Sequence, residues 1–148
     1  MNPRYVQVMS VPSSLQVRVE VAAGGFIKRR PDGSVDFVSP VSSPFAYGSV
    51  LGTEAQDGDP EDALIVGCKP VVGSTVSHPV WGQVVFMDAG HEDNKWVVGP
   101  CEPSEKEWRR ITRFFRLYAV AKRALYKVRS TSGETRFECV RRWDTPLG

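Results

Sequence analysis

The sequence predicts a β-rich α+β fold, a small β-barrel with a helix packed on its outside. Two observations lead to this prediction. Short runs of alternating or β-branched apolar residues, separated by Gly, Pro and Ser turns, fill most of the chain before position 100. One long amphipathic pattern follows and runs to about Lys127. Because the 148 residues contain no internal repeat or linker, we expect a single domain over 1–148.

Eight segments are expected to form strands. In Leu15–Val21 the odd positions should face the core, which places Arg18 and Glu20 together on the opposite face. Two further segments should form a hairpin, because the turn sequence P-D-G-S lies between them at 31–34. The expected strands are Tyr5–Met9, Leu15–Val21, Phe26–Arg30, Val35–Val38, Ala63–Val66, Val80–Met87, Lys95–Gly99 and Thr135–Val140. The expected loops include 39–44 and 73–79.

The expected helix begins at Ser104, because Ser104 and Glu107 have the spacing of a capping box just after Pro103. Its apolar residues should form one stripe that packs on the barrel. The residues of this expected stripe are Trp108, Ile111, Phe115, Tyr118, Ala121 and Leu125.

Composition excludes several classes of protein. The formal net charge of +2 is too small to imply a nucleic-acid partner, and no apolar stretch is long enough to span a membrane. The first residues lack the pattern of a signal peptide. Three irregularly spaced cysteines, Cys68, Cys101 and Cys139, suit a reducing compartment, so the cytoplasm is expected. Zinc is not expected, because there is no C-x-x-C, and His78 and His91 have no second histidine at ligand spacing.

Two acidic clusters are the main candidates for chemistry. Residues 57–63 read D-G-D-P-E-D-A and lead into a predicted buried strand. Carboxylates packed this closely repel one another, so the fold must neutralise them, and a hard divalent metal is the expected neutraliser. The spacing does not fit an EF-hand, and an acidic surface turn remains the alternative. The same ingredients recur at 88–95, D-A-G-H-E-D-N-K, directly after an apolar run.

Together these stretches resemble the soluble (family I) inorganic pyrophosphatases, which carry D-x-D-P-x-D before an apolar residue. About thirty residues later that family has an aspartate and then E-D-x-K opening a strand. The resemblance covers about 17–118. It implies a distorted five-stranded OB-like β-barrel with a flanking α-helix. It also implies Mg²⁺-dependent hydrolysis of inorganic pyrophosphate to two phosphates by a metal-activated water, with several Mg²⁺ ions per site and Mn²⁺ as an alternative.

The resemblance also assigns roles to the acidic residues. Asp59 matches the general base that takes a proton from the attacking water. Glu20 matches an acidic residue that holds metal-bound water, although an exposed strand residue paired with Lys or Arg is an equal alternative. The aspartates that match magnesium ligands are Asp57, Asp62 and Asp93, with Asp88 and Asp93 serving a further ion.

The phosphate-binding side matches the family only in part. Its matching residues are Lys28, Tyr47, Lys95 and, in the helix motif F-F-x-x-Y, Tyr118. The family has a lysine where this chain has Ala119, an arginine that 35–45 lacks, and Y-E in place of Arg29 and Arg30. Lys122, one turn beyond Tyr118, and Arg30, on the strand face of Lys28, are the expected replacements. The alternative is that both are ordinary solvated charges.

Pyrophosphate is therefore the expected partner, and neither nucleic acid nor a membrane is. A homo-oligomer is expected, because relatives form dimers or hexamers. One alternative is a divergent or inactive member that keeps its metals but acts on another phosphoanhydride or on none. A second alternative is an OB-like nucleic-acid-binding module, because the helix is rich in arginine.

Overall fold

The computed structural model of the protein describes residues 13–25, 27–29, 34–38, 42–55, 58–128 and 132–143. For 27–29 and 35–38 it describes the backbone alone. The expected strand Tyr5–Met9 and the candidate site residues Arg30 and Asp57 lie outside the described residues.

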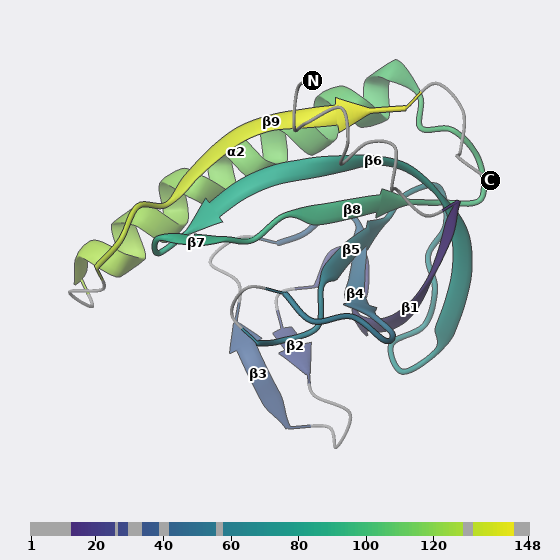
Figure 1. Cartoon of the computed structure of the whole chain (residues 1–148), viewed down its shortest axis with the longest axis horizontal. Helices are drawn as coiled ribbons and strands as arrows, with labels where there is room; N and C mark the ends of the chain where they lie inside the picture. Colours follow the sequence, from purple (N-terminus) through teal and green to yellow (C-terminus); the bar gives the residue numbers. More distant parts are fainter. Residues whose placement is uncertain are drawn as a thin grey trace, which may run out of the picture.

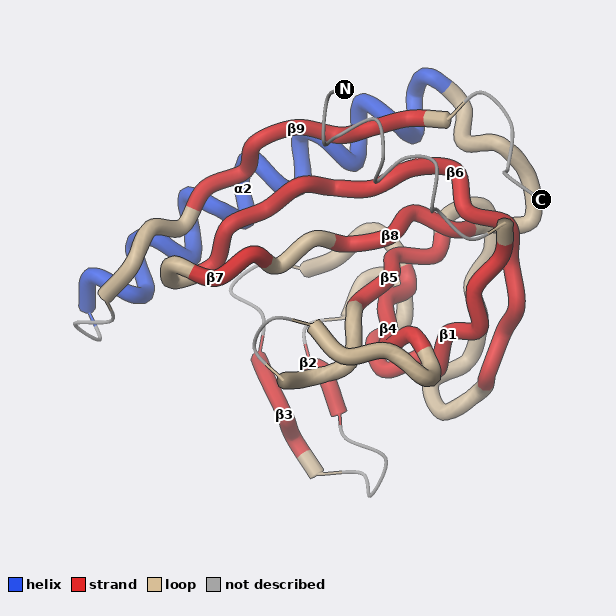
Figure 2. The backbone as a smooth tube through the Cα atoms, viewed as in Figure 1, coloured by secondary structure: helices blue, strands red, loops and turns tan. Residues whose placement is uncertain are grey.

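Strands β1, β4, β5, β8 and β6 form a closed ring (Figures 1 and 2). Neighbouring strands pair antiparallel, except for β5 and β8, which are parallel. The ring closes because β1 also pairs with β6. This confirms the expected OB-like barrel. The five strands are β1 (Ser14–Val21), β4 (Ala46–Val50), β5 (Asp62–Ile65), β8 (Lys95–Val98) and β6 (Thr75–Asp88).

Strand β6 is long enough, at 14 residues, to pair with two different barrel strands. Its first part, Thr75–Pro79, pairs with β1, and its second part pairs with β8 from Val80 onwards. The expected loop at 73–79 is therefore wrong from Thr75 on. Pro79 is tolerated inside the strand because its neighbour Val80 makes the hydrogen bond to β1 at this point: Val80 N–H donates to the carbonyl of Ser13 at 3.1 Å, and no donor is required from Pro79.

The remaining strands extend this framework. Strand β9 (Arg136–Arg142) pairs with the second part of β6, and the short β7 (His91–Glu92), which was not predicted, pairs with the end of β6. Strands β2 (Ile27–Arg29) and β3 (Val35–Val38) pair with each other as a separate sheet, which confirms the expected hairpin.

Strand β4 was not predicted, although it carries the candidate residue Tyr47. Its central residue, Gly48, lies directly against β1. A Cβ atom at Gly48 would lie 2.0 Å from the backbone oxygen of Arg18, so only glycine allows these two strands to approach so closely.

The helix α2 (Glu105–Val128) packs against the outside of the barrel, beside β6 and β9 (Figure 1). Its capping box is confirmed: Glu107 N–H donates to the Ser104 hydroxyl at 3.1 Å, and Ser104 N–H donates to the Glu107 carboxylate at 3.0 Å. The expected stripe is wrong at its C-terminal end, because Ala121 and Leu125 are only partly buried. With 3.6 residues per turn, the buried stripe continues instead through Ala119 and Lys122.

The barrel has two hydrophobic cores, and β5 contributes to both. Ala63 and Ile65 point into the ring, whereas Leu64 packs in the layer between the ring and the helix. Strand β5 is thus buried on both faces, as is usual for a strand paired in parallel. The core fixes where β5 begins, and so fixes the position of Asp62. In the part of the chain that the structure describes, no helix is long and apolar enough to cross a membrane.

Candidate active site

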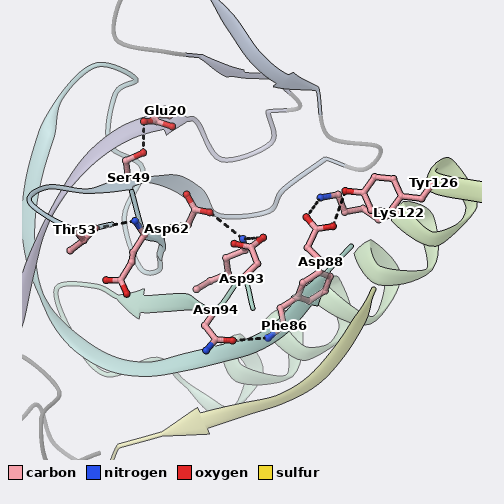
Figure 3. Close-up of polar contacts among 12 residues, drawn as sticks. Glu20, Ser49, Thr53, Asp62, Phe86, Asp88, Asp93, Asn94, Lys122 and Tyr126 are labelled. Carbon is pink, nitrogen blue, oxygen red and sulfur yellow. Dashed lines mark hydrogen bonds and ion pairs between the residues drawn. The ribbon is translucent and has the colours of Figure 1, made fainter. Parts of the chain in front are cut away.

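Asp62, Lys95 and Asp93 meet at the adjoining ends of two strands. Asp62 opens β5 and Lys95 opens β8, and the parallel register places these two residues opposite each other. The ammonium Nζ of Lys95 lies 3.1 Å from Asp62 Oδ2 and 2.6 Å from Asp93 Oδ2. Lys95 is only 2% exposed. Two carboxylates from clusters far apart in sequence thus converge on one buried cation, and Figure 3 shows them facing each other.

Tyr47, on the neighbouring strand β4, borders this group. Lys95 Nζ lies 5.8 Å from the centre of its ring. Burial, followed by the charge of Asp62, raises the pKa of Tyr47 well above its usual value. Burial lowers the pKa of Lys95, but Tyr47, Asp62 and Asp93 together outweigh this and hold that pKa well above its usual value. At neutral pH the pair therefore consists of a neutral phenol and an ammonium ion.

The chain around Asp93 is held by hydrogen bonds to β6. Asp93 N–H donates to the carbonyl of Phe86 at 2.9 Å, and Phe86 N–H donates to Asn94 Oδ1 at 3.0 Å. Asn94 was not predicted as a site residue. Its side chain ties the second acidic cluster to the strand that precedes it, so the position of Asp93 depends on Asn94 (Figure 3).

The turn after β6 sets the position of Asp88. Its residues Ala89 and Gly90 have positive φ values of 49° and 86°. Ala89 N–H donates to the hydroxyl of Thr135 at 2.9 Å, and Gly90 N–H donates to the carbonyl of Glu134 at 2.8 Å. The segment that leads into β9 therefore supports the turn.

Asp88 is held by the helix. Its Oδ2 atom lies 2.5 Å from Lys122 Nζ, and its Oδ1 atom accepts a hydrogen bond of 2.7 Å from the Tyr126 hydroxyl (Figure 3). Lys122 is 4% exposed, so the alternative of a solvated charge is wrong for this residue. Its ammonium lies 5.2 Å from the centre of the Tyr118 ring. Tyr126 was missed by the sequence analysis, although Tyr118, Lys122 and Tyr126 recur at four-residue spacing, which marks one helix face.

Glu20 is buried rather than exposed. It is 7% exposed, and its Oε1 atom accepts a hydrogen bond of 2.5 Å from the Ser49 hydroxyl. The alternative of an exposed strand residue is therefore wrong. Ser49 pairs with Arg18 in the β1–β4 register, two positions before Glu20 on β1, so the hydrogen bond joins adjacent strands. Ser49 carried no signal that sequence alone could detect.

The first acidic loop is described from Gly58 onwards. Gly58 has a positive φ of 89°, as the predicted tight turn requires, and Asp59 beside it is exposed. The carbonyl of Asp59 accepts a hydrogen bond of 2.6 Å from Ala55 N–H. Of the substrate-side residues, Lys28 lies on β2, whose side chains are not described.

The carboxylates of the site are the candidate donors for a metal ion. Among the described residues, which exclude Asp57, no group of three or more His, Cys, Asp and Glu side chains is arranged to hold a metal ion. The carboxylates of Asp62 and Asp93 nevertheless offer hard oxygen donors on either side of one nitrogen, which suits Mg²⁺ or Mn²⁺.

The three cysteines are free, His91 is exposed, and the half-buried His78 contacts the Cys68 sulfur at 3.8 Å.

The fold and this cluster define a class: OB-like barrels with carboxylates and lysines gathered where neighbouring strands begin. Residues 8–138 match the sequence model of a family described as inorganic pyrophosphatase. The chain therefore belongs to the soluble (family I) inorganic pyrophosphatases.

Individual relatives agree with this family. The inorganic pyrophosphatase of Gluconobacter oxydans is 28% identical over 123 residues, covering 78% of this chain and 71% of that protein. That of Halalkalibacterium halodurans is 31% identical over 99 residues, covering 62% of this chain and 61% of that protein, which is less than two thirds of its length. The crystal structure of inorganic pyrophosphatase from Thermus thermophilus shares the fold, with a TM-score of 0.72 at 21% identity over 90% of this chain and 84% of that one.

Proposed function

We propose that this protein hydrolyses inorganic pyrophosphate to two phosphates with the help of Mg²⁺, for which Mn²⁺ can substitute. The observation that carries the proposal is the convergence of Asp62 and Asp93 on Lys95. Two carboxylates that converge at one place offer hard oxygen donors of the kind that a divalent cation prefers. A highly charged phosphoanhydride requires such cations beside its oxygens.

The acidic residues bind the metal ions and act on the attacking water. Asp57, Asp62 and Asp93 hold the ions, and a bound ion supplies charge neutralisation and acidifies the attacking water. Asp59 is the general base. Asp59 is exposed on its turn, whereas Lys95 is buried between Asp62 and Asp93. This exposure supports a role in accepting a proton from water. Glu20, held by Ser49, orients water at the edge of the ions.

The basic and phenolic residues bind the phosphate groups of the substrate. Lys95 and Tyr47 donate hydrogen bonds to phosphate oxygens, because one is an ammonium and the other a neutral phenol at neutral pH. Lys28 and Arg30, from the β2 region, and Tyr118 and Lys122, from the helix, supply the remaining donors. Lys122 takes over the charge that the family places at the position of Ala119.

A test compares matched carboxylate variants. Asp93→Asn should lower phosphate release from pyrophosphate with Mg²⁺ by about 10²-fold or more, as expected when a metal ligand is lost. Glu102→Gln, an exposed carboxylate outside the site, should leave the rate unchanged. Arg30→Ala should cost roughly ten- to a hundredfold, the value of one charge-assisted bond. Equal rates for Asp93→Asn and the wild type would refute the proposed site.

The second candidate is a divergent member that acts on another phosphoanhydride. Ala119 favours it, because the chain lacks the family lysine at this position. Measuring phosphate release from triphosphate and from ATP beside pyrophosphate separates the two. A nucleic-acid-binding module is the third candidate, based on the exposed Arg109, Arg113 and Arg116, and a salt-dependent gel shift tests it.

The proposed setting is the cytoplasm, and the proposed assembly is a homo-oligomer without a nucleic-acid or membrane partner. The three free cysteines support a reducing compartment. Sedimentation of the purified protein measures the assembly.

A further inference from the structure

Cys68 and Cys101 lie just beyond the ends of the parallel strands β5 and β8, which run side by side in the barrel (Figure 1). The register of this strand pair places Asp62 opposite Lys95, an offset of 33 positions. The two cysteines are separated by the same 33 positions. Cys68 therefore occupies the position opposite Cys101 when the register is extended beyond the strands.

The two chain segments remain together after the strands end. Val66 N–H donates to the carbonyl of Val98 at 2.8 Å. A Cβ atom at Gly67 would lie 3.7 Å from the side chain of Pro100, so these two residues adjoin, and the cysteines are the next pair along. Neighbouring strands lie about 4.7–4.9 Å apart, and a disulfide requires Cα atoms about 4.4–6.8 Å apart. The spacing of this strand pair thus suits a disulfide.

The surroundings of the two thiols differ. Cys101 is exposed, so an oxidant in solution reaches it directly, whereas Cys68 is half-buried. Burial, followed by the neighbouring Cys101, raises the pKa of Cys68, so the Cys68 thiol keeps its proton at neutral pH. A base for that proton lies on β6, where His78 Nε2 is 3.8 Å from the Cys68 sulfur. Burial lowers the pKa of His78, so its imidazole is neutral at neutral pH and can accept a proton.

From this arrangement we propose that Cys68 and Cys101 are a peroxide-sensitive pair that forms an intramolecular disulfide. The Cys101 thiolate attacks one oxygen of hydrogen peroxide, the O–O bond breaks, and the hydroxide that leaves takes up the thiol proton as water, so Cys101 becomes a sulfenic acid. The Cys68 sulfur then attacks the Cys101 sulfur while His78 accepts the Cys68 proton. The S–O bond breaks, and the second hydroxide leaves as water with the proton from His78. Two thiols and one peroxide thus give one disulfide and two waters.

This disulfide would join the ends of the two strands whose beginnings carry Asp62 and Lys95. It closes a loop in the chain and so restricts the unfolded state, which should stabilise the pairing of β5 with β8. Thiol reductants reverse it, as is usual for a redox-sensing disulfide in a reducing compartment. Its formation does not depend on the proposed hydrolysis of pyrophosphate.

The first test oxidises the purified, reduced protein with a small excess of hydrogen peroxide and maps the disulfides by mass spectrometry. We expect one major cross-link, between Cys68 and Cys101, with Cys139 still free for alkylation. The same treatment in urea is the control. Loops of similar length close with similar ease in an unfolded chain, so Cys101 should then pair with Cys139 about as often as with Cys68. Pairing of Cys139 in the folded protein, a cross-link only between two molecules, or no cross-link would overturn the proposal.

Single substitutions separate the roles of the residues. Cys139→Ser should form the disulfide as the wild type does, and Cys68→Ser should stop at the sulfenic acid of Cys101, which dimedone traps. His78→Gln should slow disulfide formation by about tenfold or more, because it removes the base. The same change should not alter the rate at which the sulfenic acid forms in Cys68→Ser. Disulfide formation at the wild-type rate in His78→Gln would overturn the role of His78.

The second test measures thermal unfolding. Oxidised wild-type protein should have a Tm about 5–10 °C above that of the reduced protein, and dithiothreitol should remove the difference. Cys101→Ser is the matched control, and peroxide should not raise its Tm. An unchanged Tm in oxidised protein that carries the cross-link would overturn the proposed stabilisation of the strand pair.

Discussion

Asp62 and Lys95 face each other across the parallel pair β5–β8, with the carboxylate and the ammonium 3.1 Å apart. Each residue opens its own strand, and 33 positions separate them in the sequence. A parallel pairing of strands brings the beginnings of both to the same edge of the sheet. The parallel pair thus brings Asp62 from the first acidic cluster and Lys95 from the second together at one edge of the sheet.

Replacing Lys95 tests this relationship. Lys95→Met should leave Asp62 and Asp93 facing each other without their buried cation, which costs about 3–5 kcal/mol of folding stability. Mg²⁺ should restore part of that loss, because an ion that binds only the folded state stabilises it. Thermal unfolding with and without Mg²⁺ measures both effects, and Lys127→Met at an exposed position is the control. A Tm equal to that of the wild type in the absence of Mg²⁺ would contradict the account.

The role of Asp59 can be separated from that of the metal ligands. Asp59→Asn should lower turnover by about 10²–10⁴-fold, the usual contribution of a positioned general base, with little change in Mg²⁺ affinity. Steady-state kinetics together with Mg²⁺ titration by calorimetry measure the two quantities. A large loss of Mg²⁺ binding in this variant would assign Asp59 to the metal instead.

Alkaline pH should weaken the fold through its buried tyrosines. The pKa values of Tyr47, Tyr118 and Tyr126 are raised, in each case first by burial. Below pH 10 these groups are neutral in both states, so they add no pH dependence. Above pH 10 the unfolded chain loses their protons and the folded chain keeps them, so stability falls as pH rises.

Denaturant unfolding between pH 8 and about 11 measures this slope, and absorbance at 295 nm follows the ionisation itself. Tyr126→Phe should make the decline shallower, because it removes one of the three groups. A stability that is constant through this range would show that the phenols ionise as readily in the folded protein as in the unfolded chain.

Ala89 holds a backbone conformation that favours glycine. Its φ of 49° costs an alanine about 1–2 kcal/mol, although part of this is offset by the greater flexibility of glycine in the unfolded chain. Ala89→Gly should therefore raise the unfolding free energy by about 0.5–1 kcal/mol. Ala124→Gly on the exposed face of α2 should lower it by about 1 kcal/mol. Thermal unfolding of both variants beside the wild type measures the direction of each change in stability. A lower Tm for Ala89→Gly would contradict this interpretation of the turn.

Much of the fold could be predicted because its signals are local. The capping box at Ser104, the hairpin of β2 and β3, and the buried strand after Asp62 all depend on residues within a few positions of one another. Strand β4 was missed because Gly48 reads as a turn residue, and only its contact with Arg18 explains the glycine.

The candidate site was predictable where the family motif supplies it, and not where tertiary packing decides. Motif spacing identified Asp62, Asp93 and Lys95, which the structure brings together. Ser49 and Thr135 bind segments that meet them only in the folded chain, so no sequence spacing reports them. Lys122 was predicted from its place on the helix, but its partner Asp88 lies 34 residues away, and that pairing appears only in the structure.

The most direct test of the central claim is phosphate release from pyrophosphate by the purified protein, with Mg²⁺ and with the metal removed by a chelator. The account predicts rapid release with Mg²⁺, slower or comparable release with Mn²⁺, and loss of activity on chelation that returns when Mg²⁺ is restored. Absence of phosphate release with either ion, from a protein shown to be folded, would contradict it and favour a divergent member with another substrate or none.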